Sequence, residues 1–268
     1  MARFAPKIGK GATTRRAAAR RVALALVAAA LAPGAAAADP APLRIGVAYL
    51  PPAAAAPEAR LYTDAGFERD LGKAIGRRLG RTVVFEAVSD PAQALTDGRI
   101  DLALARLPED AAPPAPLAAI DTGYASPLGL SMRTDTDIRA WGDLAGRRIC
   151  VAEGDAEARR LAEAAGARVR TERAPARALM QVRTGDCDAA LHDAVLLEAL
   201  FQDPRWRKFS AGLPPRSPSR LTALAGPGLA AGIRAALGDL QDWPARRARW
   251  ARNVAFEVYL DQEAPDCH

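Results

Sequence analysis

The segment TGDCDAALHD, residues 184–193, brings a cysteine, a histidine and three acidic residues together within ten positions. Such side chains could bind zinc, and a cysteine with a nearby histidine could act as a nucleophile with its base. Alternatively, the cysteine could form a disulfide beside a binding cleft. A zinc site needs more ligands than His192 and the terminal His268 provide, and Cys187 and His192 would be poorly oriented on one strand to share a proton. We therefore expect no metal site, no catalytic residues and no cofactor.

The first 38 residues have the pattern of a secretory signal peptide. Arginines within residues 15–21 form a basic region, Val22–Ala32 is an apolar run, and Ala36-Ala37-Ala38 offers a cleavage site before Asp39. The apolar run is too short to span a bilayer, and no cysteine follows it for lipid attachment. These features predict export to the periplasm without membrane insertion, and they leave the Sec and twin-arginine routes both open.

Removal of this leader changes the charge of the protein. The chain has 37 Lys and Arg residues against 31 acidic residues, a net charge of +6, but seven of the basic residues and none of the acidic ones lie in the leader. The remaining 30 basic and 31 acidic residues are interspersed. We therefore expect no binding to nucleic acid. About 230 residues suffice for one large domain or two smaller lobes.

Two successive series of alternating strands and helices follow the leader. This alternation predicts parallel sheets with helices on their faces, an α/β fold. In the first series we expect strands over 43–50, 82–88 and 100–105, with helices over 65–80 and from Asp90; residues 107–118 read as a loop. In the second we expect strands over 147–152, 167–172 and 188–192, helices over 155–166, 175–185 and 193–201, a weaker strand over 208–213 and a helix over 228–243.

The two series predict two α/β lobes joined by a hinge. We expect residues 39–127 plus 222–268 to form the first lobe and residues 128–221 to form the second. The crossings would fall near 126–130 and 221–225. A small ligand would bind in the cleft between the lobes, at the carboxyl ends of the strands.

Several short pieces, in this order and spacing, resemble the periplasmic solute-binding proteins of polar-amino-acid ABC importers, the extracellular solute-binding protein family 3 with the type II periplasmic binding fold. The resemblance implies a non-catalytic monomer that captures a small polar solute, amino-acid-like or an amine, and delivers it to an inner-membrane ABC permease. The pieces are LRIGV, GFERDLGKAIGRRLG, DGRIDLALA, DTGYASPLGLSMR, DLAGRRICVAEG and RTGDCDAALHD.

The resemblance also implies a disulfide between Cys150 and Cys187, because several members that bind acidic amino acids have cysteines at both places. An oxidising compartment is consistent with this pairing. Closing a loop of about 38 residues would stabilise the fold by roughly 4 kcal/mol in the chain-entropy model. Cys267 stays unassigned.

Three acidic residues and one arginine are candidates for ligand contact. In the resembled family, the acid at the place of Asp193 accepts hydrogen bonds from the ligand's α-amino group; alternatively, Asp193 only caps the helix that follows. Asp110 occupies the place of the arginine that binds the ligand carboxylate, and Arg106 is the nearby substitute. Asp155 stands at the family's anion-binding turn, where an acid would repel a carboxylate.

Other departures from the family weaken the expectation of an amino-acid ligand. Ala53 follows Pro51-Pro52 where the family has an aromatic residue, so Tyr49 and Tyr124 are the remaining candidates for ring contacts with a ligand. If Asp110, Asp155 and Asp193 all face the cleft, a polyamine or another basic amine becomes a candidate.

Two other functions remain open for this fold. One is an accessory partner of a periplasmic quinoprotein dehydrogenase. The other is an enzyme similar to cyclohexadienyl dehydratase, which would need a group that binds substrate carboxylates.

Overall fold

The computed structural model describes residues 40–50, 67–238, 240 and 242–261. The predicted signal peptide, Pro51–Ala53 and Cys267 lie outside these residues. The described residues belong to one compact unit that begins at Pro40. No helix in this part of the chain is long and apolar enough to cross a bilayer.

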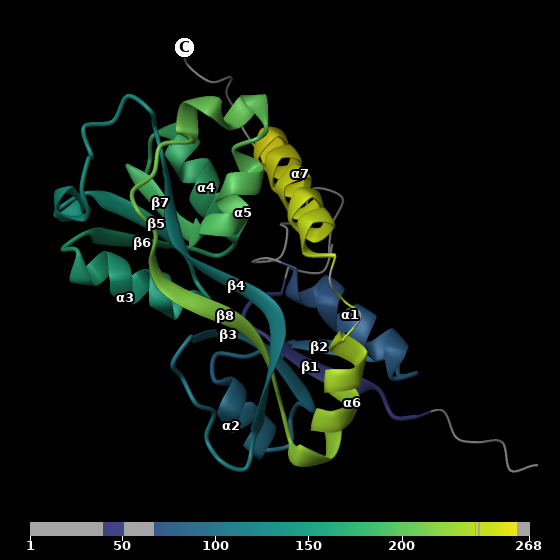
Figure 1. The fold of residues 1–268 in the computed structure, drawn as a ribbon. Helices are drawn as coiled ribbons and strands as arrows, with labels where there is room; N and C mark the ends of the chain where they lie inside the picture. The colour runs from purple at the N-terminus through teal and green to yellow at the C-terminus, as the bar shows by residue number, and fades with distance from the viewer. Residues whose placement is uncertain (1–39, 51–66, 239, 241, 262–268) are drawn as a thin grey trace, which may run out of the picture. The chain divides into compact units, whose positions relative to one another are not determined.

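Eight strands form one mixed sheet in the order β2-β1-β3-β8-β4-β7-β5-β6 (Figure 1). At one end β1 pairs in parallel with β2 and β3, and at the other β5 pairs in parallel with β6 and β7. We call these the first and second sections. Between them, β8 runs antiparallel to β3 and β4, and β4 runs antiparallel to β7. The strands are β1 Leu43–Val47, β2 Val83–Ala87, β3 Leu102–Pro108, β4 Ala118–Met132, β5 Arg148–Ala152, β6 Arg168–Glu172, β7 Ala189–Asp193 and β8 Arg216–Ala225.

Helices pack on both sections, and several of their ends follow directly from the sequence. The carboxylates of Asp90 and Asp155 accept hydrogen bonds of 2.9 Å from the backbone of Gln93 and Ala158. Gly185, with φ of 81°, ends α4 in the left-handed region that favours glycine. The helices are α1 Glu68–Arg78, α2 Pro91–Thr96, α3 Ala156–Ala164, α4 Pro175–Thr184, α5 Ala194–Leu200, α6 Pro227–Leu237 and α7 Trp243–Asp261, with short 3-10 helices η1 Trp141–Leu144 and η2 Pro204–Phe209.

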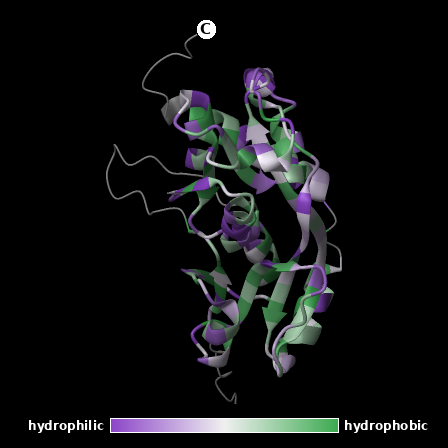
Figure 2. Ribbon diagram, turned by 90° about the vertical axis from the view of Figure 1, so that its left-hand side faces the viewer, coloured by the Kyte–Doolittle hydropathy of each residue, from purple (hydrophilic) through white to green (hydrophobic). Residues whose placement is uncertain are grey.

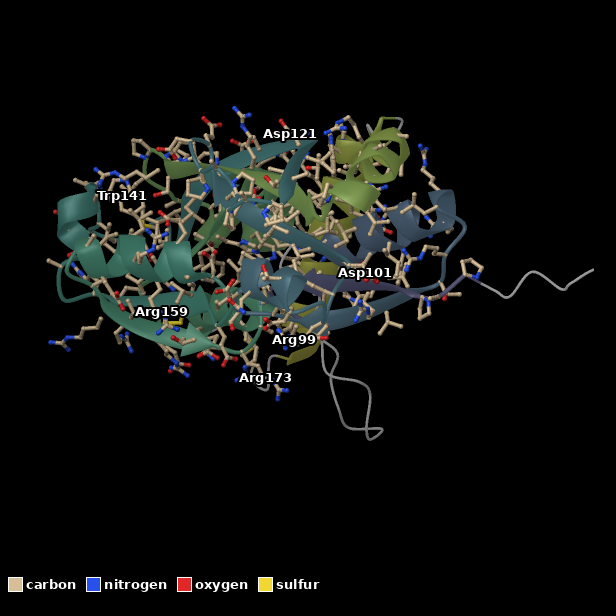
Figure 3. All side chains as sticks on the ribbon, turned by 90° about the horizontal axis from the view of Figure 1, so that it is seen from below. Arg99, Asp101, Asp121, Trp141, Arg159 and Arg173 are labelled. Atoms are coloured by element: carbon tan, nitrogen blue, oxygen red, sulfur yellow. A yellow bond between two sulfur atoms is a disulfide. The ribbon has the colours of Figure 1, made fainter. Side chains whose placement is uncertain are left out.

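The apolar positions of these elements form the core. Leu71 and Ile75, four residues apart on one face of α1, are fully buried with Leu43 and Ile45 of β1. Figure 2 shows the strands largely in the hydrophobic colour. Asp101, labelled in Figure 3, ties β1 to the start of β3 by accepting a hydrogen bond of 2.9 Å from the Arg44 backbone.

The two C-terminal helices differ in the sections they contact. Helix α6 contacts α1 of the first section. Helix α7 contacts α4 and α5, beside which it lies in Figure 1, and also reaches α1 through ion pairs of Arg246 and Arg249 with Asp70. Trp250 and Val254 of α7 are buried in the same core cluster as Leu196 of α5. The predicted helix over 228–243 corresponds to α6 but ends earlier, at Leu237, and a separate helix, α7, begins at Trp243.

Two other sequence expectations are wrong in detail. Residues 208–213 do not form a strand, because Asp203 and Pro204 start the 3-10 helix η2, and only Ala211 makes an isolated bridge, to Met132. The loop expected over 107–118 is shorter, since β3 reaches Pro108 and β4 begins at Ala118. Pairing with β8 from Ala118 to Leu128 accounts for most of the length of β4.

Candidate functional site

A cavity of about 1150 Å³ lies at the carboxyl ends of strands from both sections. The first section contributes residues that follow β1, β2 and β3, and the second section contributes residues that follow or end β5, β6 and β7. Five of the six predicted ligand-binding residues line the cavity: Tyr49, Arg106, Asp110, Asp155 and Asp193.

Asp193 ends β7 and is only 2% exposed. Its carboxylate accepts hydrogen bonds from the Ser126 hydroxyl at 2.6 Å, from the Tyr124 hydroxyl at 3.0 Å and from the Leu196 backbone at 2.9 Å. The bond from Leu196 caps α5, so Asp193 has the predicted capping role and also faces the cavity.

Arg106 of β3 forms an ion pair with Asp193. Its side chain is 24% exposed, and its guanidinium carbon lies 5.5 Å from the centre of the Tyr124 ring. Burial alone would raise the pKa of Asp193, but the Arg106 charge and the hydrogen bonds from Ser126 and Leu196 hold it below its ordinary value. Burial alone would lower the pKa of Arg106, but Asp193 and Glu68 hold it above its ordinary value. Both groups are therefore charged at neutral pH.

Tyr124 is not among the residues that line the cavity. Its ring is 3% exposed and packs against Phe67 and Trp243, with ring centres 4.6 Å and 5.5 Å away. Burial first, and then the Asp193 charge, raise the pKa of Tyr124, so its hydroxyl remains a donor to Asp193. The expected ring contact between Tyr124 and a ligand is therefore corrected: Tyr124 positions Asp193 instead.

Asp155 caps α3 at the cavity wall. Its carboxylate occupies the helix amino end that would otherwise attract an anion, by accepting from the Ala158 backbone at 2.9 Å. Burial raises the pKa of Asp155, and the nearby Arg106 charge reduces this rise only in part. Next to it, Gly154 approaches the first section so closely that an added Cβ would lie 2.8 Å from the Ala48 carbonyl oxygen.

The site also includes residues that the sequence did not single out: Glu68 and Arg173 line the cavity, and Ser126 contacts Asp193 from outside the lining. Ser126 binds Asp193 from the predicted crossing, and its position there was the available signal. Glu68, 8% exposed at the start of α1, lies 4.0 Å from the Arg106 guanidinium and gave no recognisable signal. Arg173, labelled in Figure 3, lines the cavity and is exposed. Among the residues that the structure describes, no group of three or more potential metal ligands occurs.

The predicted Cys150–Cys187 disulfide is confirmed, with a Cα–Cα distance of 5.9 Å. It joins β5 to the turn between α4 and β7, and both cysteines are buried away from the cavity lining. The segment 184–193 therefore carries a covalent link at one end and a cleft carboxylate at the other.

His192 makes the stability of the fold depend on pH. It is 8% exposed, and its unprotonated Nδ1 accepts from the Asp193 backbone at 2.7 Å. Burial lowers the pKa of His192 to about 4. Below pH ~6.5 His192 becomes protonated in the unfolded chain but stays neutral in the folded protein. The free energy of unfolding therefore decreases as pH falls, by about 3 kcal/mol in total near pH 4.

Urea unfolding of wild type and His192→Gln at several pH values between 4 and 7 checks this expectation. The variant should show a flatter profile over this range. The raised pKa of Asp155 acts in the opposite direction, because it stabilises the folded state relative to the unfolded chain as pH falls. Asp155 is present in both proteins, so its contribution cancels when the two profiles are compared. Parallel profiles for the two proteins would contradict the assignment.

Solved structures of amino-acid-binding proteins share this fold. The holo arginine-binding protein ArgBP of T. maritima superposes with a TM-score of 0.55 and 19% identity, over 82% of this chain and 96% of that one. The GluR0 ligand-binding core in complex with L-glutamate gives a TM-score of 0.57 and 18% identity, over 79% and 96%. An ancestral arginine-binding protein bound to arginine gives 0.54 and 23%, over 78% and 96%. No protein-family model and no curated protein sequence matches the chain.

These likenesses define the class of structure: a mixed α/β protein with the type II periplasmic binding fold. At this level of identity they show the fold alone.

Proposed function

We propose that this chain is a non-catalytic solute-binding protein of the periplasm, that it serves an ABC importer, and that its two predicted lobes close on the solute. One observation carries the proposal: a large cavity lies at the carboxyl ends of strands from both sections and is lined by polar and charged side chains. Clefts in this position are the usual ligand sites of open α/β sheets. The solved proteins that share the fold and bind arginine or glutamate support it.

The charges around the cavity favour a cationic solute. Seven acidic residues line it against three arginines, of which Arg106 is already paired with Asp193. Asp155 occupies the helix amino end that could have bound a carboxylate. We therefore infer an amine or a basic amino-acid-like compound as the solute, delivered to an inner-membrane permease. The acidic residues are Glu68, Glu109, Asp110, Glu153, Asp155, Glu157 and Asp193.

Thermal unfolding of the protein from residue 39 onward, with amines, polyamines, amino acids and organic acids, tests this proposal. A solute at a hundred times its Kd adds about 2.7 kcal/mol to the free energy of unfolding. Asp155→Asn should weaken binding of a cationic solute, whereas Asp135→Asn, an exposed carboxylate that does not line the cavity, should not. Absence of stabilisation by every compound class would argue against solute binding.

The Arg106–Asp193 ion pair favours a second candidate function. Because Arg106 already neutralises Asp193, the cleft does not need a solute cation at this position. Such a cleft is suited to an accessory protein that binds a periplasmic quinoprotein dehydrogenase without carrying a solute. Co-elution of the purified protein with such a dehydrogenase, combined with a negative solute screen, would support this role. We do not propose a dehydratase, because Arg106, the candidate group for binding a substrate carboxylate, is engaged by Asp193.

A further inference from the structure

We propose that Arg106 is an internal ligand of the cleft. Its guanidinium occupies the place at Asp193 that the cationic group of a solute would need, and it links the two sections when no solute is bound. This inference concerns the cleft of the proposed function and refines its specificity, but it holds whether or not a natural solute exists.

The acceptor capacity of Asp193 is the first argument. An ionised carboxylate has about four acceptor sites on its two oxygens. The Ser126 hydroxyl and the Leu196 backbone donate to Oδ1, the single hydroxyl hydrogen of Tyr124 is shared between the two oxygens, and Oδ2 faces Arg106. No site is left for an added ammonium group, so a solute cation can reach Asp193 only by displacing Arg106.

The origin of the two charges is the second argument. Arg106 belongs to β3 of the first section and Asp193 to β7 of the second, and these strands are not neighbours in the sheet. The ion pair therefore exists only while the two sections are close. The approach of Gly154 to the Ala48 carbonyl is a second contact between the sections beside the cavity.

The burial of the pair is the third argument. Asp193 is 2% exposed and Arg106 is 24% exposed, so the attraction is screened much less than on the surface. Removal of Arg106 would leave a buried carboxylate without its counter-ion, which is destabilising, and a small cation that pairs with the carboxylate would relieve this cost. Arg106 therefore determines specificity by keeping small cations from Asp193.

Replacement of Arg106 should convert the cleft into a cation site. The variant Arg106→Ser removes the guanidinium and leaves Ser126, Tyr124 and Leu196 in place. Methylguanidinium and methylammonium at millimolar concentration are the probes, with sodium chloride at equal ionic strength as the reference. We expect Arg106→Ser to have a lower Tm than wild type, and methylguanidinium to raise that Tm while leaving wild type unchanged. By calorimetric titration, the probe should bind the variant at least about tenfold more tightly than wild type.

Arg173→Ser is the matched control, because Arg173 lines the same cavity but is exposed and forms no ion pair within the described residues. It should bind the probes as weakly as wild type. The double variant Arg106→Ser/Asp193→Asn should lose the gained binding. If Arg106→Ser does not fold, Arg106→Gln replaces it. Equal probe affinity in wild type and the Arg106 variant, or retention of the gain in the double variant, would overturn the inference.

The experiment distinguishes failure of this inference from failure of the proposed solute-binding function. A wild-type protein that binds a natural solute while Arg106→Ser gains no probe site supports solute binding and overturns the internal ligand. A wild-type protein that binds no solute while Arg106→Ser gains the probe site supports the internal ligand and favours the accessory role.

Discussion

Asp193→Ala is expected to lower the free energy of unfolding by about 3 kcal/mol or more. The substitution removes the counter-ion of Arg106, the acceptor for the Ser126 and Tyr124 hydroxyls and the cap of α5 in one step. The penalty arises mainly from the partners left behind, because buried donors without an acceptor cost more than the average hydrogen bond contributes.

Urea unfolding of Asp193→Ala, Asp193→Asn and a surface control measures this effect. Asp193→Asn retains an oxygen that can cap α5, so its loss should be smaller than that of the alanine variant. The control Asp135→Ala breaks the Arg133–Asp135 pair, whose side chains are 40% and 60% exposed, and should cost less than about 1 kcal/mol. Equal losses for Asp193→Ala and Asp135→Ala would show that Asp193 is not held as described.

Removal of the Cys150–Cys187 disulfide is expected to cost about 4 kcal/mol. The bond closes a loop with a sequence separation of 37 residues, and its loss would release conformational entropy in the unfolded chain. The loop contains β5, α3, β6 and α4, so the bond constrains most of the second section. The cavity wall should survive, because neither cysteine lines it.

Unfolding of wild type with and without reductant, beside the double variant Cys150→Ala/Cys187→Ala, measures this contribution. Reduction should destabilise wild type and leave the double variant unchanged. Both proteins should carry Cys267→Ser, so that the third cysteine of the chain does not respond to the reductant. A reductant effect of the same size in the double variant would contradict the prediction.

Features of the fold that depend on residues close together in the sequence were predicted well. The alternation of strands and helices predicted both parallel sections. The expected strand over 208–213 is wrong because Asp203 and Pro204 start a 3-10 helix. The length of β4 was not predicted because it depends on pairing with β8, a partner distant in sequence.

In the cleft, too, individual residues could be predicted from the sequence, but contacts between distant residues could not. The resemblance to the solute-binding proteins implied Asp193 as a ligand contact, and its position before a helix gave the capping alternative. Its ion pair with Arg106 could not be predicted, because the two residues belong to different sections whose approach no local pattern encodes. Tyr124 was identified as a residue of the site, but its place behind Asp193 follows from packing against Phe67 and Trp243.

The irregular stretches of β4 have a mechanical consequence. Strands β4 and β8 run through the middle of the sheet, and their register shifts between Asp121 and Tyr124 and again between Ser126 and Leu128. Bulges are the points at which a strand bends most readily. Tyr124 and Ser126, at the edges of these irregularities, are the residues whose hydroxyls bind Asp193. Any bending of β4 at these points would therefore change the hydrogen bonds that position the Asp193 carboxylate.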